Sequence, residues 1–147
     1  MRYDELKLKN QLCFPLYAAS RELIKSHREY LEQIDVTYTQ FIVMLVLWEE
    51  RKLNVKALGR RLCLDSGTLT PVLKSLEAKG YVARARSDED ERMLMVEVTP
   101  EGDALKARAE SLPHRAAGPA NLSEEEADQL YRLLYKLLNM DPEHPVN

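Results

Sequence analysis

The chain has 147 residues, 45% of them hydrophobic, and a formal net charge of −3, which predicts a single globular domain with no separate catalytic domain. Its polar N-terminus, MRYDELKLKN, lacks an apolar signal region, and no apolar run approaches the ~20 residues of a membrane span. We therefore expect a cytoplasmic protein without membrane contacts. The two cysteines lie far apart and the three histidines are scattered, so we expect no disulfide framework, no metal site and no cofactor.

The first predicted element is a long helix over residues 6–34, where apolar residues recur at helical spacing. Cys13, Tyr17 and His27 lie on nearly the same side of this helix. Pro15 removes one helical hydrogen bond, so the helix is expected to kink or to restart near Cys13. A restart would place the thiol close to free backbone N–H groups, which favour a thiolate.

A second helix is predicted to open at Thr37, because Thr37 and Gln40 have the spacing of a capping box. Residues 41–48 are apolar almost all round, which indicates a buried core helix in which Trp48 has no cofactor role. The charged residues 49–52 then return the chain to the surface.

Two short helices joined by a turn are predicted for residues 54–80. Asn54 is the expected N-cap of the first helix, and Asp65-Ser66-Gly67 is expected to form the turn and to cap the second. Cys63, on the apolar side of this junction, is expected to pack in the core. One face of the second helix is apolar, and the polar residues free to point elsewhere are Ser66, Thr68, Thr70, Lys74 and Ser75.

Two strands, 81–86 and 93–98, are predicted next, joined by the charged tip 87–92. The order helix, turn, helix, hairpin is typical of the winged helix-turn-helix, whose second helix enters the major groove of DNA. We therefore expect a mainly α fold with a small β-wing and a DNA-binding lobe over 36–99. From Arg51 to Arg92 ten Lys/Arg accompany six Asp/Glu, a net of +4 that leaves −7 on the rest of the chain. Charge alone would suit an ordinary solvated surface, but together with the motif it favours a face for duplex DNA.

The C-terminal part of the chain is predicted to form two further helices. Thr99 and Pro100 are an N-cap and an N1 proline for a helix that runs to about Ser111, before the Pro- and Gly-containing stretch 113–119. A second capping box, at Ser123 and Glu126, opens a leucine-rich helix that reaches Leu138. No remaining part of a small lobe covers its apolar stripe, so this helix needs a partner surface.

The motif LDSGTLTP at 64–71, followed by RSDEDER at 86–92, resembles the MarR family of transcriptional regulators, and most closely its one-cysteine OhrR branch. The resemblance covers residues 10–138. It implies one domain over 1–147 whose helices 6–34 and 100–140 form a homodimer, and a repressor that binds a palindromic operator. It further implies that Arg92 enters the minor groove and that Asp90 orients it, while Ser75 stands where a long cation is expected. The residues expected at the DNA are Ser66, Thr68, Thr70, Lys74, Arg84, Arg86, Asp90 and Arg92.

Cys13 is the candidate redox residue, although a cysteine on an apolar stripe is more often a small buried hydrophobe. Its place near a helix start, with Tyr17 one turn away to donate a hydrogen bond, favours a reactive thiol. The resemblance implies oxidation by organic hydroperoxides, with Tyr38 of the partner subunit and a second tyrosine bonded to the thiol. His27 occupies the second tyrosine's position. With no cysteine after Cys63, the sulfenic acid is expected to react with a low-molecular-weight thiol or to be over-oxidised.

Three alternatives compete with this interpretation. A related regulator could respond to an amphipathic or phenolic ligand while Cys13 stays inert. A thiol peroxidase would also use a reactive cysteine, but no peroxidase motif surrounds Cys13 and the basic wing would be unexplained. A purely structural dimerisation module would leave the helix-turn-helix without a role. We expect a regulator and not an enzyme.

Overall fold

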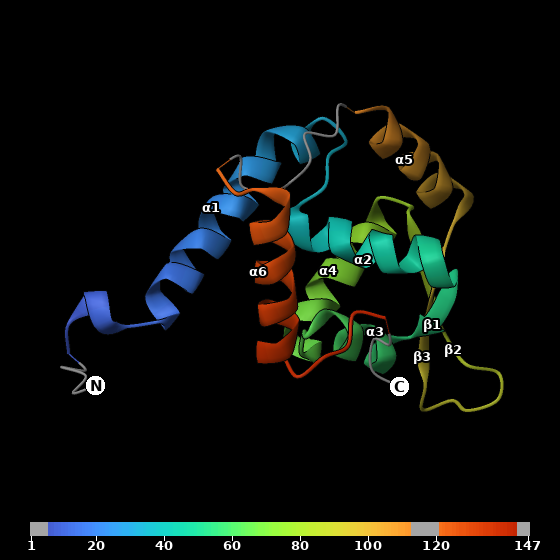
Figure 1. Ribbon diagram of the computed structural model, residues 1–147. Coiled ribbons are helices and arrows are strands. Elements are labelled where there is room, and N and C mark those ends of the chain that lie inside the picture. Colours follow the sequence, from blue (N-terminus) through green and yellow to red (C-terminus); the bar gives the residue numbers. More distant parts are fainter. Residues whose placement is uncertain (1–5, 113–120, 144–147) are drawn as a thin grey trace.

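The computed structural model describes residues 6–112 and 121–143. A short 3-10 helix, η1, precedes six α-helices and three strands (Figure 1). In chain order they are η1 Leu8–Asn10, α1 Cys13–Glu32, α2 Tyr38–Glu50, β1 Lys52–Asn54, α3 Val55–Leu62, α4 Ser66–Ala78, β2 Val82–Arg86, β3 Leu94–Val98, α5 Pro100–Ser111 and α6 Glu124–Leu137. The predicted mainly α class with a small sheet is confirmed. The expected break at 113–119 lies outside the described residues.

The N-terminal helix restarts at Cys13, as Pro15 suggested, and the continuous helix over 6–34 is wrong in this respect. Pro15 is the third residue of α1, where its missing N–H would have no helical acceptor. At the other end Asp35 adopts a left-handed φ of 54°, which turns the chain into α2. That turn sets the angle between α1 and the lobe.

The core forms around α2, which packs against α1, α3, α4, α5 and two strands. Val43, Met44 and Leu47 are fully buried, as expected for a helix that is apolar all round. Trp48 is half-buried and its indole Nε1 donates a hydrogen bond to the carbonyl of Gly102, at 2.9 Å. The predicted capping box is also present, because the Thr37 and Gln40 side chains each accept from the other's backbone N–H.

The wing sheet has three antiparallel strands in the order β1-β3-β2, and the sequence pattern missed β1. Residues 49–52 were expected to be a surface connection, but Lys52 already pairs with Glu97, and Leu53 with Val96. Arg51, at φ 66°, reverses the chain, and its carbonyl accepts from the N–H of Val98. A strand of three residues is too short for alternating hydrophobicity to predict it.

Helix α5 begins at Thr99 and Pro100, as predicted, and lies very close to the wing. The Thr99 hydroxyl donates to the carbonyl of Gly80 and accepts from the N–H of Gly102. A Cβ atom on Gly102 would lie 2.3 Å from the carbonyl oxygen of Tyr81. Only glycine fits this contact between α5 and the chain entering β2.

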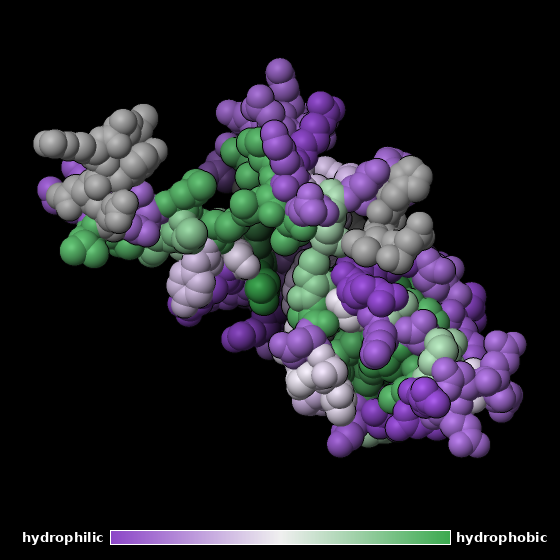
Figure 2. Space-filling model, turned by 90° about the horizontal axis from the view of Figure 1, so that it is seen from below, coloured by the Kyte–Doolittle hydropathy of each residue, from purple (hydrophilic) through white to green (hydrophobic). Residues whose placement is uncertain are grey.

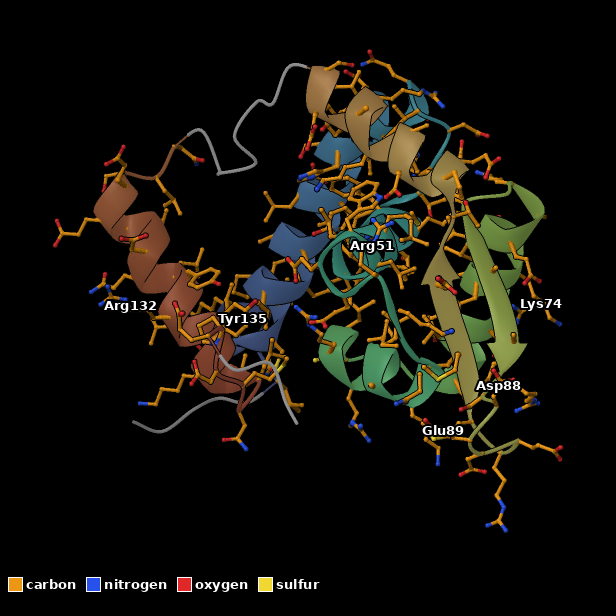
Figure 3. The ribbon with its side chains drawn as sticks, turned by 90° about the vertical axis from the view of Figure 1, so that its right-hand side faces the viewer. Arg51, Lys74, Asp88, Glu89, Arg132 and Tyr135 are labelled. Atoms are coloured by element: carbon orange, nitrogen blue, oxygen red, sulfur yellow. The ribbon has the colours of Figure 1, made fainter. Side chains whose placement is uncertain are left out.

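Helices α1 and α6 extend beyond the lobe and carry uncovered apolar residues (Figures 1 and 3). Leu12 is 80% exposed at the start of α1, and Leu133 and Leu137 are 60% and 64% exposed on α6. Figure 2 shows hydrophobic surface gathered on the side of the molecule from which η1 and the start of α1 project. Within the described ranges no helix is both long and apolar enough to cross a membrane.

Candidate functional site

The turn between α3 and α4 fixes the start of the second helix of the helix-turn-helix. Cys63 ends α3 in a left-handed conformation, and the N–H of Leu64 donates to the carbonyl of Gly59. The Asp65 carboxylate then accepts from the N–H of Thr68 at 2.8 Å, as an N-cap. This bond holds the pKa of Asp65 below its ordinary value. The first turn of α4 is thereby held in place while its outer face stays open.

Helix α4 has a buried face and a polar face, as its sequence pattern predicted. Leu69, Leu73 and Leu76 are buried in the lobe. On the other side Ser66, Thr68 and Lys74 are exposed, and the hydroxyl of half-buried Thr70 donates to the carbonyl of Ser66. Figure 3 shows Lys74 on the side of the molecule away from α6.

Ser75 does not share the polar face. Its hydroxyl accepts a hydrogen bond of 2.9 Å from the Gln40 side chain of α2, so it points into the lobe. The prediction that Ser75 is free to point elsewhere is therefore wrong. Helical spacing predicted the apolar stripe of α4, but it did not predict that Ser75, at the edge of this stripe, also points towards the core.

Arg84 is held against the end of α4 instead of standing free on the wing. Its guanidinium Nη2 donates to Glu77 at 3.1 Å, and its backbone N–H donates to the other carboxylate oxygen at 3.0 Å. These two bonds lower the pKa of Glu77. The Arg84 side chain is 18% exposed and its Nε atom is buried without a partner. The contact of Arg84 with DNA stays a prediction. Its hydrogen bonds to Glu77 connect β2 to the end of α4.

The wing tip, residues 87–92, is held by backbone bonds and by Asp90. The Asp90 carboxylate accepts from the backbone N–H of Arg92 at 3.0 Å, and the carbonyl of Asp90 accepts from the N–H of Met93. Asp90 therefore shapes the backbone at Arg92 rather than binding its guanidinium. Arg86 and Arg92 are exposed at this end of the hairpin, where Figure 3 shows Asp88 and Glu89.

The predicted redox residues do not all come together within one chain. Cys13 is the first residue of α1 and is exposed, one turn from Tyr17. The Tyr17 hydroxyl accepts from the guanidinium of Arg21 at 3.2 Å. At the far end of α1, roughly 21 Å along the helix, the His27 ring lies 5.2 Å from that of Tyr38. A single chain thus brings His27 and Tyr38 together but leaves Cys13 apart from both.

The hydrogen bonds of His27 restrict what its ring can offer to a thiolate. Nδ1 lies 2.7 Å from the carbonyl oxygen of Leu23, and since a carbonyl only accepts, Nδ1 carries the proton. In the neutral ring Nε2 is then an acceptor. His27 can donate from Nε2 only as an imidazolium, which a tyrosine hydroxyl at this position would not require.

Cys63 is exposed, and the prediction that it packs in the core is wrong. Its left-handed backbone, φ 54°, turns the side chain away from the apolar face of α3. The thiol lies 3.2 Å from the sulfur of Met140, just beyond α6. Both cysteines of the chain are therefore exposed.

A cleft of about 280 Å³ lies where α1 meets the start of α2. Its lining mixes apolar side chains with one cation and one phenol, and comprises Ile24, Arg28, Leu31, Glu32, Val36, Thr37, Tyr38 and Thr39. Such a mixture suits a small amphipathic molecule. No group of three His, Cys, Asp or Glu side chains in residues 6–112 and 121–143 is placed to hold a metal ion.

Comparisons with known proteins agree on one family. Residues 25–109 match the family described as transcriptional regulator SarA/Rot. The organic hydroperoxide resistance transcriptional regulator of Bacillus subtilis is 45% identical over 137 residues, 93% of each chain. Reduced AbfR bound to DNA, from Staphylococcus epidermidis, superposes with a TM-score of 0.76 at 34% identity, over 95% of this chain and 97% of that one.

A mutant MarR of E. coli complexed with operator DNA superposes with a TM-score of 0.79 at 28% identity, over 86% of this chain and 93% of that one. The chain belongs to the MarR family of transcriptional regulators. Its winged helix and its likeness to the organic hydroperoxide branch are as the sequence motifs predicted. The relatives are transcription regulators, so the thiol peroxidase alternative is excluded.

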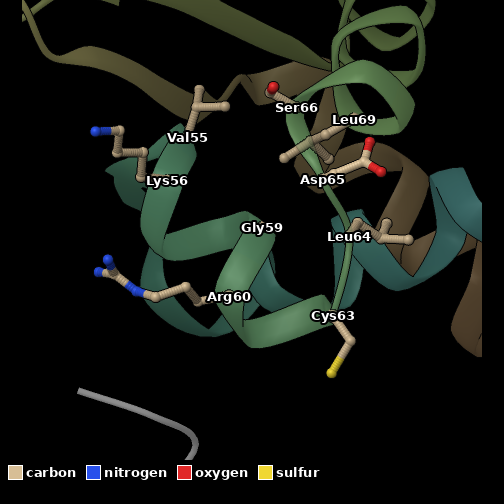
Figure 4. A pocket seen from close by; sticks show the side chains of 9 residues that line it. All are labelled: Val55, Lys56, Gly59, Arg60, Cys63, Leu64, Asp65, Ser66 and Leu69. Atoms are coloured by element: carbon tan, nitrogen blue, oxygen red, sulfur yellow. The ribbon is translucent and has the colours of Figure 1, made fainter.

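Two cations of this MarR-family lobe were missed by sequence reasoning. Lys56 and Arg60 project from α3 beside a cavity of about 550 Å³ that separates α3 from the start of α4 (Figure 4). Ser66 lines the same cavity. The spacing of four residues was visible in the sequence, since it places both cations on one side of a helix. By contrast Arg61, next in the chain, pairs with Glu49 and Glu50.

Proposed function

We propose that this MarR-family protein is a homodimeric repressor that binds a palindromic operator and leaves it when Cys13 is oxidised by an organic hydroperoxide. The observation that carries the redox part is the position of Cys13, exposed in the first turn of α1, in a chain 45% identical to an organic hydroperoxide resistance regulator. AbfR, a structural relative, has been solved in reduced and overoxidized forms bound to DNA.

The DNA-binding face combines α4, which is the recognition helix, with the wing tip and α3. Ser66, Thr68 and Thr70 lie on the outer side of α4, where hydroxyls can reach base edges in the major groove. Lys74 of α4 and Arg86 at the end of β2 are exposed cations that suit phosphate contacts. Lys56 and Arg60 extend the same positive surface along α3. Arg92 is exposed at the wing tip, where its backbone N–H donates to Asp90, and we expect its side chain to enter the narrow minor groove.

The uncovered apolar residues of α1 and α6 support a homodimer formed by helices 6–34 and 100–140. Leaving Leu12, Leu133 and Leu137 in water is unfavourable, and a two-fold partner would bury them. Such a dimer presents two copies of α4 to half-sites about 34 Å apart. It would also bring Tyr38 and His27 of one subunit towards Cys13 of the other.

Oxidation of Cys13 needs only the hydroperoxide, and a second reagent enters when the oxidised cysteine reacts further. The Cys13 thiolate attacks the terminal oxygen of the hydroperoxide, a sulfur–oxygen bond forms and the peroxide bond breaks, giving a sulfenic acid and an alkoxide that takes a proton from water to become the alcohol. A low-molecular-weight thiol then condenses with the sulfenic acid, releasing water and leaving a mixed disulfide. The added bulk at the start of α1 shifts the dimer helices and, with them, the spacing of the two recognition helices.

The test uses Cys13→Ser and Cys63→Ser proteins on the DNA upstream of the protein's own gene, with and without cumene hydroperoxide. Because both thiols are exposed, Cys63→Ser is a matched control for simple accessibility. Parent and Cys63→Ser proteins should release DNA and gain one oxygen on Cys13 by mass spectrometry. Cys13→Ser protein should bind and stay bound. Release of DNA by oxidised Cys13→Ser protein would contradict the proposal.

The cleft at the α1–α2 junction favours a second candidate, a regulator that responds to an amphipathic or phenolic ligand while Cys13 is inert. Arg28 and Tyr38 line this cleft together with apolar Ile24 and Leu31. Mass spectrometry after one equivalent of hydroperoxide separates the two candidates. Unmodified Cys13, together with DNA release by a phenolic acid, would favour the ligand-responsive regulator.

A further inference from the structure

Gln40 is the one buried polar side chain in the part of the chain that the structure describes, 6% exposed. It is the third residue of α2, and its side-chain oxygen accepts from the backbone N–H of Thr37 at 3.0 Å. Its side-chain amide donates to Ser75 of α4 at 2.9 Å. One buried side chain therefore joins the start of α2 to the recognition helix, and burial makes each of its bonds costly to lose.

Lys79 adds a second connection from the same face of α4. One turn beyond Ser75, its ammonium lies 3.4 Å from the side-chain oxygen of Gln40 and 3.5 Å from the Asp35 carboxylate, and it also donates to the Asp35 carbonyl. Asp35 is the left-handed residue that turns α1 into α2. The last turns of α4 are thus held by the start of α2 and by the α1–α2 turn.

The capping box formed by Thr37 and Gln40 also lies next to α1, through Tyr38. Tyr38 is adjacent to Thr37, its ring packs at a tilt against that of His27 in α1, and it lines the cleft of about 280 Å³ at that junction. A displacement of Tyr38 moves the first turn of α2. Because the Thr37–Gln40 box is reciprocal, Gln40 cannot keep its geometry with Thr37 and with Ser75 if that turn shifts.

We propose that Gln40 is the positioning residue that passes a change at Tyr38 to the recognition helix, through its hydrogen bond to Ser75. The inference rests on the proposed function only in taking Tyr38 as the place where the signal arrives. Serine suits position 75 because its short side chain holds the hydroxyl at the helix surface, within reach of Gln40. The serine at the place where the MarR resemblance suggested a long cation thus has a specific role here.

The first test measures amide hydrogen exchange in DNA-free protein, without oxidant. Tyr38→Ala is made in the parent and in a Ser75→Ala background, with Ser111→Ala as the control background, since the Ser111 hydroxyl bonds only within α5. In the parent and control backgrounds Tyr38→Ala should raise exchange in the last turn of α4 by about fivefold or more. In the Ser75→Ala background the increase should fall below about twofold, because the connection is already absent.

Amides of α3 serve as the internal reference. Equal acceleration in α3 and α4 would mean that Tyr38→Ala loosens the whole lobe, and additive effects of Tyr38→Ala and Ser75→Ala would mean that no connection exists. Either result overturns the inference.

The second test measures DNA affinity with and without cumene hydroperoxide. Ser75→Ala protein should lose most of the fold difference between the two conditions, whereas a merely structural role would lower both affinities and keep their ratio. If the parent itself ignores hydroperoxide, the proposed function fails while the exchange experiment still decides the inference. If the parent responds and the exchange effects are additive, only the inference fails.

Discussion

Cations that look alike in the sequence have different roles once their partners are known. Arg61 and Arg84 are paired with glutamates of the lobe and are mostly buried, whereas Arg86 and Arg92 are exposed on the wing. A net charge of +4 over the segment 51–92 predicted the positive face, but pairing between distant residues decides which cations it contains.

Arg92→Ala should weaken binding to operator DNA by about 1–3 kcal/mol, roughly fivefold to 150-fold, because an arginine in the minor groove contributes both charge and shape recognition. Its stability should be nearly unchanged, since the guanidinium is exposed and Asp90 bonds only its backbone. Fluorescence anisotropy at moderate salt measures the change in affinity. Arg108→Ala, an exposed arginine on α5, away from the wing tip in Figure 1, is the charge-matched control.

Equal affinities for Arg92→Ala and parent protein would show that the wing tip does not enter the groove. Equal losses for Arg92→Ala and Arg108→Ala would mean that net charge alone matters.

Local patterns predicted positions along a helix better than they predicted orientations at its end. Leu69, Leu73 and Leu76 are buried as their spacing indicated. Cys63 continued the pattern of α3 in the sequence, yet its left-handed backbone turns it outward. Tertiary hydrogen bonds, like that between Gln40 and Ser75, join residues far apart in the chain and leave no local pattern.

At the scale of elements, the capping signals were the most reliable part of the sequence. Thr37, Asn54, Asp65, Thr99 and Ser123 all cap the helices that they were expected to open. Their side chains act on backbone groups within three residues, so the evidence is contained in the local sequence. β1 was missed because its stability comes from pairing with β3, more than forty residues later.

The contact between β2 and α4 should make stability depend on pH through Glu77. Arg84 lowers the pKa of Glu77 in the folded protein, so the carboxylate stabilises the fold above its ordinary value of about 4.3, and this contribution is lost as the pH falls through the lowered pKa. Glu77→Gln should therefore melt below the parent near pH 7 and approach it as the pH falls through the lowered pKa of Glu77. Thermal unfolding followed by circular dichroism over this range measures both curves.

Glu97→Gln, an exposed glutamate of β3 that lies 3.6 Å from Lys52, is the control and should show a much smaller difference. A constant gap between Glu77→Gln and the parent at every pH would exclude titration of Glu77 as its origin.

Gly102→Ala should destabilise the lobe by about 1–3 kcal/mol, because its Cβ would meet the Tyr81 carbonyl oxygen at 2.3 Å and a methyl of Val98 at 2.7 Å. Gly67→Ala makes the same substitution at an exposed site whose nearest atom is a carboxylate oxygen at 3.3 Å, and should change stability by less than about 0.5 kcal/mol. Urea unfolding of both variants gives the two values. Similar stabilities would show that α5 can move away from the wing.

At the scale of the whole molecule, the sequence predicted that α6 needs a partner surface, and its leucines are indeed exposed in the single chain. The order of helices and hairpin was enough to predict the lobe. The relative placement of two subunits depends on contacts between copies, which helical periodicity in one chain does not contain.

Truncating the chain before Asn121 should give a monomer-prone or poorly folded protein, because it removes α6 and its exposed leucines Leu133 and Leu137 from the expected interface. Analytical ultracentrifugation measures the mass, and circular dichroism measures how much of the lobe remains folded. A truncated chain that stays dimeric with the parent's stability would place the interface elsewhere.

The strand order β1-β3-β2 has a consequence for the behaviour of the wing in a crowded solution. A sheet edge with free backbone groups can recruit strands of other molecules and start aggregation. Here β3 is enclosed, one edge is a strand of only three residues that ends at a helix, and the other carries exposed Arg86 and is held against α4 by the Arg84–Glu77 pair. Short and charged edges resist intermolecular strand pairing, so the wing can project into solvent without joining the wing of a neighbouring molecule.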